Sequence, residues 1–399
     1  MVRKFLLPVV CLASTTFVNA QKLDFGDIFK DAEKQTQVLI KNTDEARKEN
    51  DKLVSPRTLE NGKLKLVASK DWTSGFFPGV LWYIYEFNKK GQWLADAQRF
   101  TALIEKEKTN GTTHDMGFKV YCSFGNGYRL TKDTGYKSVL IQSAQTLATR
   151  FSPVVGCIRS WDHHADQWKF PVIIDNMMNL ELLFEASKLS GDSSYYKIAV
   201  SHANTTMKNH FRADYSCYHV VDYDPETGKV VHKQTHQGFS DESAWARGQA
   251  WALYGYTMCY RETGDPAYLA HAEKVAAYIL NNPNMPKDLV PYWDFNAPNI
   301  PNEPRDASAA AVIASGLYEL SQYSKGSAKY YKETADKIIN SLTKSYRADK
   351  GTYQGFILTQ STGSKPANSE VDVPLNYADY YYLEALLRAK KIKEGKKLF

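Results

Sequence analysis

Cysteines are few in this sequence, and none is placed as a metal ligand. The chain has five cysteines in 399 residues. Cys122, Cys157, Cys217 and Cys259 lie far apart with no CxxC pair, and Cys11 falls within the first 20 residues. Because structural zinc sites need closely grouped Cys or His ligands, this spacing excludes one. We expect the four later cysteines to be buried free thiols.

Signatures for nucleotides and nucleic acids are also absent. The chain contains no phosphate-binding loop, no dinucleotide fingerprint and no GxSxG nucleophile motif. The net charge is +6, and no Lys/Arg-rich block precedes residues 390–397. Nucleic-acid binding needs a basic stripe with interleaved aromatic residues, so we expect no nucleic-acid partner. A mildly basic protein remains compatible with a small anionic ligand.

Long apolar runs are missing after the first 20 residues, which have the pattern of a signal peptide. Arg3 and Lys4 precede an apolar stretch at 5–17, and Val-Asn-Ala at 18–20 forms a cleavage site. The apolar stretch is too short to span a bilayer, and no later one is longer. We therefore expect export to the periplasm without a membrane span. The residues before Cys11 match a lipoprotein signal poorly, which disfavours a lipid anchor.

Aromatic residues, in contrast, are abundant. The chain has 26 Tyr, 18 Phe and 8 Trp, which together make up 13% of the residues. Sugar-binding proteins use flat aromatic faces to stack on pyranose rings, while polar neighbours bind the hydroxyls. A tyrosine-rich helical core would give the same composition. Composition alone leaves both interpretations open.

Apolar residues recur at helical spacing through most of the chain. The segment at 55–70 is polar and is expected to be a loop. Residues 218–222 and 229–232 flank a turn at 224–228 and predict a β-hairpin. The expected helices are 25–48, 76–88, 94–107, 115–124, 136–151, 177–189, 195–211, 242–262, 268–280, 307–323, 330–346 and 377–389.

The helices fall into pairs with a weak internal repeat. Ser-Gly-Asp at 190–192 recurs as Thr-Gly-Asp at 263–265, and in both copies a glycine ends one helix before a polar residue starts the next. The copies lie 73 residues apart, which is too long for the near-constant short period of an open solenoid. A closed (α/α) toroid fits better. We expect an all-α fold with a short β-hairpin in a rim loop, built as a single catalytic domain at 21–399.

Two aspartates could share one chemical task. Asp175 follows the apolar run 170–174 and precedes a helical pattern, and Asp115 in the segment 112–118 also introduces one. Either side chain could simply cap its helix. If the two converge on one cleft, burial and mutual repulsion would raise the pKa of one carboxyl and keep it protonated. Such a pair suits cleavage of a glycosidic bond.

The segment 236–251 contains a second constellation. Arg247 and Trp251 lie four residues apart, so they share one helix face and offer a guanidinium fork beside an aromatic plate. A structural Arg–acid pair with a core tryptophan is the alternative. Trp72 opens another helix and can form one wall of a pocket. The segment 161–166 holds adjacent histidines, but it lacks a helical i, i+4 histidine pair, and we expect no metal there.

Together these motifs resemble glycoside hydrolase family 88, the unsaturated glucuronyl hydrolases. The resemblance runs in order over nearly the whole chain after residue 20. It implies an (α/α)6 barrel without a metal or other cofactor. It also implies a substrate that carries a 4,5-unsaturated uronic acid at its non-reducing end, as polysaccharide lyases produce. The motifs are WTSGFFPGVLW (72–82), HDMGF (114–118), IIDNMMNLELLFEA (173–186), THQGFSDESAWARGQAWALYG (235–255) and NYADYYYLEALLR (376–388).

The resemblance also implies a mechanism that hydrates an enol ether. Asp175 would protonate C4 of the ring double bond, water would add at C5, and the resulting hemiketal would collapse with loss of the glycosidic bond. Asp115 would contact the sugar and help to keep Asp175 protonated. By the same matching, the implied substrate-binding residues are Trp72, His219, Gln237, Arg247 and Trp251, with Arg247 facing a charged substrate group.

Three other functions compete with this interpretation. The related rhamnogalacturonyl hydrolases share the implied fold and chemistry but act on pectin fragments. A toroid that binds sugar without catalysis would not need both acids. An epimerase on a similar barrel would use histidines as its acid and base. The sequence does not specify the linkage, the sulfation pattern, the adjoining sugar or the oligomeric state.

Overall fold

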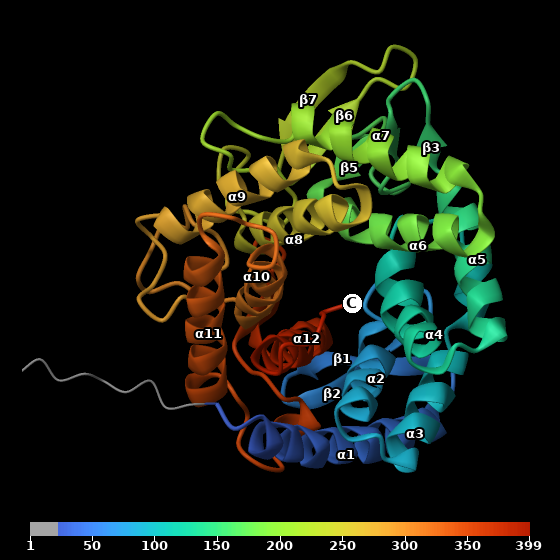
Figure 1. Cartoon of the computed structure of the whole chain (residues 1–399), viewed down its shortest axis with the longest axis vertical. Coiled ribbons are helices and arrows are strands. Elements are labelled where there is room, and N and C mark those ends of the chain that lie inside the picture. The colour runs from blue at the N-terminus through green and yellow to red at the C-terminus, as the bar shows by residue number, and fades with distance from the viewer. Residues whose placement is uncertain (1–22) are drawn as a thin grey trace, which may run out of the picture.

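The computed structural model describes residues 23–399, so the expected signal peptide at 1–20 lies outside the described residues. Six helical segments form the inner layer of a ring (Figure 1). In chain order they are α2 (Phe76–Asn88), the π-helix η2 (Gly117–Gly125) with α4 (Asn126–Thr131), α6 (Leu180–Ser190), α8 (Ala246–Thr263), α10 (Ala307–Leu320) and α12 (Asn376–Lys393). Each packs against the next, and α12 packs against α2, which closes the ring.

A second layer of helices surrounds the first (Figure 1). It consists of α1 (Phe25–Glu49), α3 (Gly91–Ala102), α5 (Thr134–Ala148), α7 (Ser193–Asn209), α9 (Pro266–Asn281) and α11 (Ala328–Ser345). Short 3-10 helices lie between them: η1 (Glu105–Thr109), η3 (Ile174–Asn179) and η4 (Tyr353–Gly355). The alternation of outer and inner helices confirms the predicted toroid.

Burial explains why a helix belongs to one layer or the other. Every residue of α10 is buried, as expected for a helix that is covered on all sides. The outer helix α11 buries only one stripe, with Tyr331, Ala335, Ile338 and Leu342 at helical spacing. Glycine allows a close approach between α8 and η3, because a Cβ on Gly255 of α8 would lie 2.6 Å from the Met177 side chain of η3. This contact seats η3 directly against α8.

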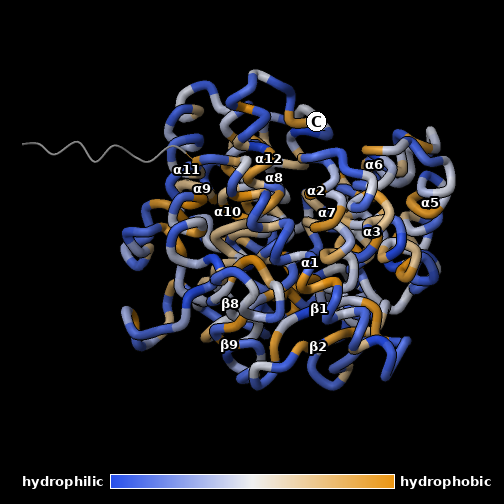
Figure 2. The backbone as a smooth tube through the Cα atoms, turned by 90° about the horizontal axis from the view of Figure 1, so that it is seen from below, coloured by the Kyte–Doolittle hydropathy of each residue, from blue (hydrophilic) through white to orange (hydrophobic). Residues whose placement is uncertain are grey.

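The strands form small antiparallel sheets that carry one end of the ring. They are β1 (Leu53–Glu60), β2 (Lys63–Ala68), β3 (Phe151–Ser152), β4 (Cys157–Ile158), β5 (Pro171–Ile173), β6 (Val220–Tyr223), β7 (Val230–Gln234), β8 (Ser361–Ser364) and β9 (Ser369–Val373). The sheet order is β1-β2, β3-β4, β5-β6-β7 and β8-β9. Figure 2 shows β1, β2, β8 and β9 at the end of the molecule opposite Phe399.

The prediction of a loop at 55–70 is wrong. These residues form most of the β1–β2 hairpin, which turns at Asn61 and Gly62 with φ of 51° and 74°. Asn-Gly with positive φ at both positions is the preferred two-residue hairpin turn, and this signal was present in the sequence. The hairpin expected around the turn 224–228 is confirmed as β6–β7, which β5 extends to three strands.

Two helix predictions differ from the structure in type. The helix expected at 177–189 begins as the 3-10 helix η3 and becomes α-helical only at Leu180. The helix expected at 115–124 is the π-helix η2. Cys122, Cys157, Cys217 and Cys259 are buried free thiols, as predicted.

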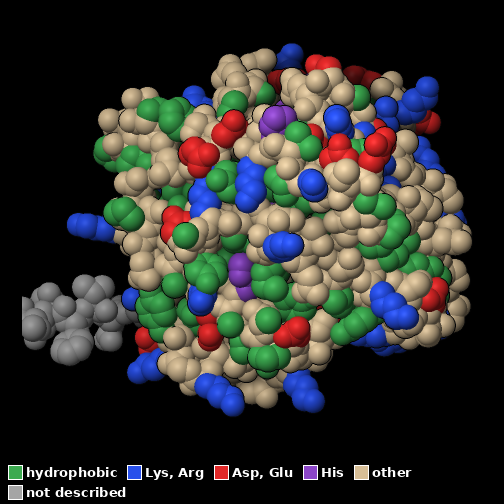
Figure 3. Space-filling view, turned by 90° about the horizontal axis from the view of Figure 1, so that it is seen from above, with side chains coloured by type: hydrophobic (Ala, Val, Ile, Leu, Met, Phe, Trp, Pro, Cys, Tyr) green, Lys and Arg blue, Asp and Glu red, His purple; other side chains and the backbone are tan. Residues whose placement is uncertain are grey.

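The surface mixes charges of both signs. Lys and Arg side chains alternate with Asp and Glu on the face that Figure 3 shows. Within residues 23–399, no helix is both long and apolar enough to cross a membrane.

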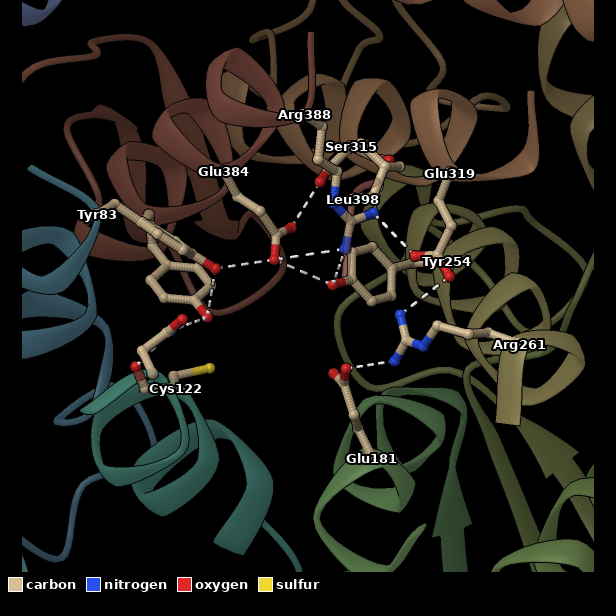
Figure 4. A network of polar contacts seen from close by, with 12 residues as sticks. Tyr83, Cys122, Glu181, Tyr254, Arg261, Ser315, Glu319, Glu384, Arg388 and Leu398 are labelled. Atoms are coloured by element: carbon tan, nitrogen blue, oxygen red, sulfur yellow. Dashed lines mark hydrogen bonds and ion pairs between the residues drawn. The ribbon is translucent and has the colours of Figure 1, made fainter. Parts of the chain in front are cut away.

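A buried polar network joins the inner helices at the end of the ring opposite the strands (Figure 4). Arg388 of α12 contacts Glu319 of α10 at 3.0 Å, and Arg261 of α8 donates to the same carboxylate at 2.9 Å and to Glu181 of α6. Glu384 of α12 accepts hydrogen bonds from side chains of α2, α8 and α10, namely Tyr83, Tyr254 and Ser315. These contacts link five of the six inner segments, and Asn126 of α4 joins the sixth through its hydrogen bond to Tyr380 at 3.1 Å, since Tyr380 also contacts Tyr83.

We expect this network to make stability depend on pH. Burial raises the pKa of Glu181 to about 7, although Arg261 opposes the shift. The unfolded chain ionises this group near its ordinary pKa of about 4.3, so the stability it contributes is lost as pH rises from there through 7. Relative to Glu181→Gln, the wild type should lose roughly 2 kcal/mol of unfolding free energy between about pH 5 and pH 8 in urea titrations.

The matched control is Glu185→Gln, on the same helix, whose side chain is 25% exposed against 16% for Glu181. Its difference from the wild type should stay constant over this pH range. A constant difference for Glu181→Gln as well would show that the buried carboxyl does not titrate there.

Candidate active site

A cleft of about 860 Å³ opens at the end of the ring that carries the strands. Its floor comes from the inner layer and from η3, and its walls come from loops and from β1, β5, β8 and β9. Because the lining residues are distant in sequence, only the closed ring brings them together. They are Arg57, Trp72, His114, Asp115, Trp161, His163, Ile173, Asp175, His236, Gln237, Arg247, Gly363, Ser364, Ala367, Ser369, Glu370 and Tyr377.

Asp175 lies on the floor of this cleft at the start of η3. The sheet places it there, because β5 ends at Ile173 and the Ile174 N–H donates to the His219 carbonyl at 3.0 Å. Asp175 is only 7% exposed. Burial raises its pKa to about 7, Arg247 opposes the shift and Asp115 adds to it. Asp175 is therefore a carboxyl group that can hold or release a proton near neutral pH.

Asp115 lines the same cleft, just before η2. Thr113 orients it twice, since the Thr113 hydroxyl donates to Asp115 Oδ2 at 2.7 Å and accepts from the Asp115 N–H at 3.1 Å. His114 Nε2 lies 3.2 Å from Asp115 Oδ1. Burial lowers the pKa of His114 and favours its neutral form. The structure thus brings Asp115 and Asp175 into one cleft.

His219 lies behind Asp175 as a neutral donor. Its Nδ1 accepts two backbone hydrogen bonds, from the N–H groups of His236 at 3.1 Å and Gln237 at 3.2 Å. The proton of the neutral ring must therefore sit on Nε2, which lies 3.6 Å from Asp175 Oδ2. Burial, together with the nearby His236 and Arg247, lowers the pKa of His219 far below its ordinary value. The imidazole consequently presents an N–H to Asp175.

Arg247 uses both terminal nitrogens within the protein. Nη1 donates to Asp306 Oδ2 at 2.7 Å and to the Thr362 carbonyl at 2.6 Å, and Nη2 donates to the Gly363 carbonyl at 2.7 Å. The guanidinium also lies 4.5 Å from the centre of the Trp245 ring. Arg247 therefore fixes the β8–β9 hairpin over the cleft and places a positive charge near Asp175. Its contact with a substrate anion stays a prediction.

Of the remaining predicted site residues, some line the cleft and others lie behind its lining. Trp72 lines the cleft, with its ring 5.0 Å from that of Tyr377, and Gln237 lines it while its amide donates to the Gly363 carbonyl at 3.0 Å. Trp251 is completely buried beneath the cleft, where it packs against Phe118. His219 and Trp251 thus support the cleft from behind its lining.

Several lining residues were not predicted. Arg57 makes a bidentate pair with Glu370, at 2.5 and 2.8 Å, across 313 residues. No local pattern signals such a pair, and Arg57 lies in the hairpin that was expected to be a loop. Tyr377 belongs to the motif at 376–388 and was passed over as part of a helix. The other lining residues that were not predicted are His114, Trp161, His163, Ile173, His236, Gly363, Ser364, Ala367 and Ser369.

The histidine-rich segment at 161–166 forms part of the wall. Trp161 stacks on His163 with ring centres 5.1 Å apart, and Asp162 pairs with Arg150 at 2.8 Å. Within the described chain, no three His, Cys, Asp or Glu side chains are grouped to hold a metal ion. Trp161 and His163 therefore contribute an aromatic surface at the mouth of the cleft.

A ring of paired helices that opens on two acidic side chains, one of them with its pKa raised to about 7, is the arrangement expected of a glycoside hydrolase of the (α/α)6-toroid class. Comparison with known proteins specifies the family. The chain belongs to glycosyl hydrolase family 88, whose family model matches residues 44–395.

Several relatives and solved structures are similar along most of the chain. An unsaturated glucuronyl hydrolase of Formosa agariphila is 55% identical over 328 residues, which cover 82% of each chain. An unsaturated chondroitin disaccharide hydrolase of Streptococcus agalactiae is 32% identical over 381 residues, 94% of each chain. The crystal structure of an unsaturated glucuronyl hydrolase specific for heparin matches with a TM-score of 0.88 and 47% identity, over 93% of this chain and 99% of that one.

We expect the titration of Asp175 to report the charges around it. Asp115→Asn removes a nearby negative charge and should lower the pKa of Asp175 by about 1 unit, whereas Arg247→Met should raise it by a similar amount. Infrared difference spectra across a pH series measure this titration, and the Asp175→Asn variant identifies the band. Asp379, also buried with a pKa of about 7, is the internal control because its band should not move. An unchanged Asp175 band in both variants would contradict the electrostatic account.

Proposed function

We propose that this enzyme removes the 4,5-unsaturated uronic acid from the non-reducing end of glycosaminoglycan fragments that a polysaccharide lyase has produced. The observation that carries the proposal is the buried Asp175, with a pKa of about 7, in one cleft with Asp115. Glycosaminoglycan-directed relatives support the substrate class, because their names specify unsaturated chondroitin disaccharides and heparin. This support favours glycosaminoglycan over pectin fragments.

In the proposed reaction, Asp175 acts as a general acid and then as a base. Its carboxyl proton is transferred to C4 of the unsaturated ring, which leaves positive charge at C5 and the ring oxygen. The Asp175 carboxylate then accepts a proton from the water that adds at C5. The resulting hemiketal opens, and the bond to the leaving sugar breaks. Hydration of a carbon–carbon double bond needs a positioned acid, which burial of Asp175 supplies.

The neighbours of Asp175 support this sequence of steps. The Nε2–H of His219 can donate to the Asp175 carboxylate after it has lost its proton, and the two backbone donors to Nδ1 keep this orientation. Asp115, oriented by Thr113, can accept a sugar hydroxyl and repels the ionised form of Asp175. The imidazole needs no proton transfer of its own, which distinguishes this proposal from an epimerase with histidine acids and bases.

The cleft walls suit a charged sugar. Trp72 presents an aromatic wall, and Gln237 offers an amide. Arg57 and Arg247 are the positively charged side chains of the lining that an anionic ring can approach, although Arg57 is already paired with Glu370 and Asp71, and Arg247 with Asp306. We propose that the uronate ring lies against Trp72, with the leaving sugar toward Trp161 at the mouth.

The decisive experiment follows the ultraviolet absorbance of the double bond in unsaturated chondroitin and heparin disaccharides. Asp175→Asn should lower kcat by roughly 10³-fold with little change in substrate affinity, because the amide cannot supply the proton. Asp379→Asn, an equally buried carboxyl outside the cleft, is the matched control and should keep its activity. Full activity of Asp175→Asn would refute the assigned role, and no turnover of any unsaturated uronide by the wild type would refute the function.

We further propose that residues 1–20 direct export to the periplasm and that 21–399 is a single catalytic domain. The positive, apolar and small-residue pattern at the N-terminus supports export. The family match over 44–395 supports one domain. Mass spectrometry of the protein from a bacterial periplasmic fraction should give an N-terminus at Gln21. Export would be contradicted if the protein stayed in the cytoplasm with residue 1 intact while a periplasmic control protein from the same cells was found in the periplasmic fraction.

A further inference from the structure

The orientation of His219 depends on a loop rather than on a side chain. The loop at 235–243 connects β7 to the approach of α8, and its backbone N–H groups at His236 and Gln237 are the two donors to His219 Nδ1. If these N–H groups moved away, a neutral imidazole could carry its proton on either nitrogen. The position of the loop therefore influences whether Nε2, the ring nitrogen that faces Asp175, carries the proton.

A buried carboxylate outside the cleft holds this loop. Asp294 is completely buried, and its Oδ2 accepts from the Phe239 N–H at 2.9 Å and from the Ser243 hydroxyl at 2.7 Å. The loop lies directly on the carboxylate, because a Cβ on Gly238 would come within 3.0 Å of Asp294 Oδ2. The other oxygen, Oδ1, accepts from the Asn296 N–H at 2.8 Å, which anchors Asp294 to its own segment.

Ser243 extends this support within the loop. Its hydroxyl accepts from the Ser240 N–H at 3.0 Å and lies 2.8 Å from the Ser240 carbonyl. The Gly238 N–H donates to the Thr235 hydroxyl at 2.8 Å. A continuous set of short contacts therefore runs from Asp294 through the loop backbone to His219.

We propose that Asp294 is a positioning residue for the catalytic acid: it holds the loop at 235–243 so that His219 is fixed with its proton on Nε2, facing Asp175. Asp294 touches neither the cleft nor Asp175, so it acts only through the loop and His219. The inference rests on the proposed function for its catalytic consequence. The tautomer of His219 is independent of that function.

Burial, together with Arg247 and the neighbouring histidines, favours a neutral His219 ring. Asp175 faces it from η3, Arg247 from α8 and His236 from the loop itself. His210, at the end of α7, and His114 also face it. The aromatic rings of Trp161 and Trp245 cover it, with the Trp245 ring centre 4.5 Å away. Two sets of groups distinguish the ring nitrogens: the backbone donors, which contact Nδ1, and the Asp175 carboxyl, which lies 3.6 Å from Nε2.

The test is nitrogen NMR of protein labelled with ¹⁵N-histidine, with the His219 signals assigned by their loss in His219→Gln. In the wild type, Nδ1 should be unprotonated and Nε2 protonated at neutral pH. In Asp294→Ala, all three acceptor contacts are lost. His219 should then populate both tautomers, and its pKa should rise toward the ordinary value. Ser243→Ala, which keeps the buried carboxylate, should shift the same signals in the same direction by less.

Asp379→Ala is the matched control. Asp379 is also buried and accepts two backbone N–H groups, from Ile357 at 2.9 Å and Leu358 at 2.7 Å, but it has no contact with the loop. In thermal unfolding, Asp379→Ala should lose about as much stability as Asp294→Ala, while its His219 signals stay as in the wild type. If folded Asp294→Ala and Ser243→Ala both keep the wild-type tautomer and pKa of His219, the proposal is wrong.

Kinetics give the catalytic readout. With an unsaturated disaccharide, Asp294→Ala should lower kcat by roughly 10-fold because the orientation of His219 is lost, and KM should also rise because His236 and Gln237 of the released loop line the cleft. Asp294→Asn, which keeps one acceptor oxygen, should recover part of kcat. If the wild type turns over no unsaturated uronide, the proposed function fails, and the NMR result still decides the role of Asp294. If kcat is unchanged while the tautomer shifts, the catalytic part of this inference is refuted.

Discussion

The chemistry depends on one carboxyl group that keeps its proton near neutral pH while remaining open to a substrate. Deep burial alone would raise the pKa of Asp175 further and leave the group too weak an acid to protonate carbon. The nearby Arg247 lowers the pKa, whereas Asp115 raises it, and the balance lies at about 7. A neutral His219 adds a hydrogen-bond donor without adding a charge. The site is therefore tuned by two opposing charges around a desolvated acid.

Contacts between the inner helices hold the elements that carry these charges together. The side chains of α10 are buried on all faces, and at the end of the ring opposite the strands Arg261 and Arg388 bind glutamates from neighbouring helices. The open end uses charges in the same way, since Arg57 pairs with Glu370 and Arg247 pairs with Asp306. Removal of one partner would leave an uncompensated buried charge, which costs several kcal/mol. At both ends of the ring, paired arginines and carboxylates therefore hold separate elements of the chain together.

Helical periodicity was sufficient to predict most of the helices, the long spacing of the internal repeat favoured a closed ring over a solenoid, and the family resemblance implied the (α/α)6 form. Periodicity failed where a local signal was overlooked, as at Asn61-Gly62, and where the helix type changes, as in η2 and η3. The family motifs located Asp115 and Asp175. Contacts between distant segments, such as the Arg57–Glu370 pair, could not be predicted, since neither residue carries a local pattern that identifies its partner.

Motif reasoning assigns functions to side chains, whereas part of this site is built from backbone groups. The segment 235–251 was notable for Arg247 and Trp251, which could bind a charged sugar. In the structure, Arg247 binds two backbone carbonyls of the β8–β9 hairpin, and Trp251 lies beneath the cleft. The groups of this segment that act on the catalytic acid include two backbone N–H donors at 236 and 237, which any residue except proline could supply. The position of these N–H groups depends on Gly238 and Ser243. The lack of a side chain at Gly238 and the hydroxyl of Ser243 are therefore explained by the position of the loop and not by contact with the substrate.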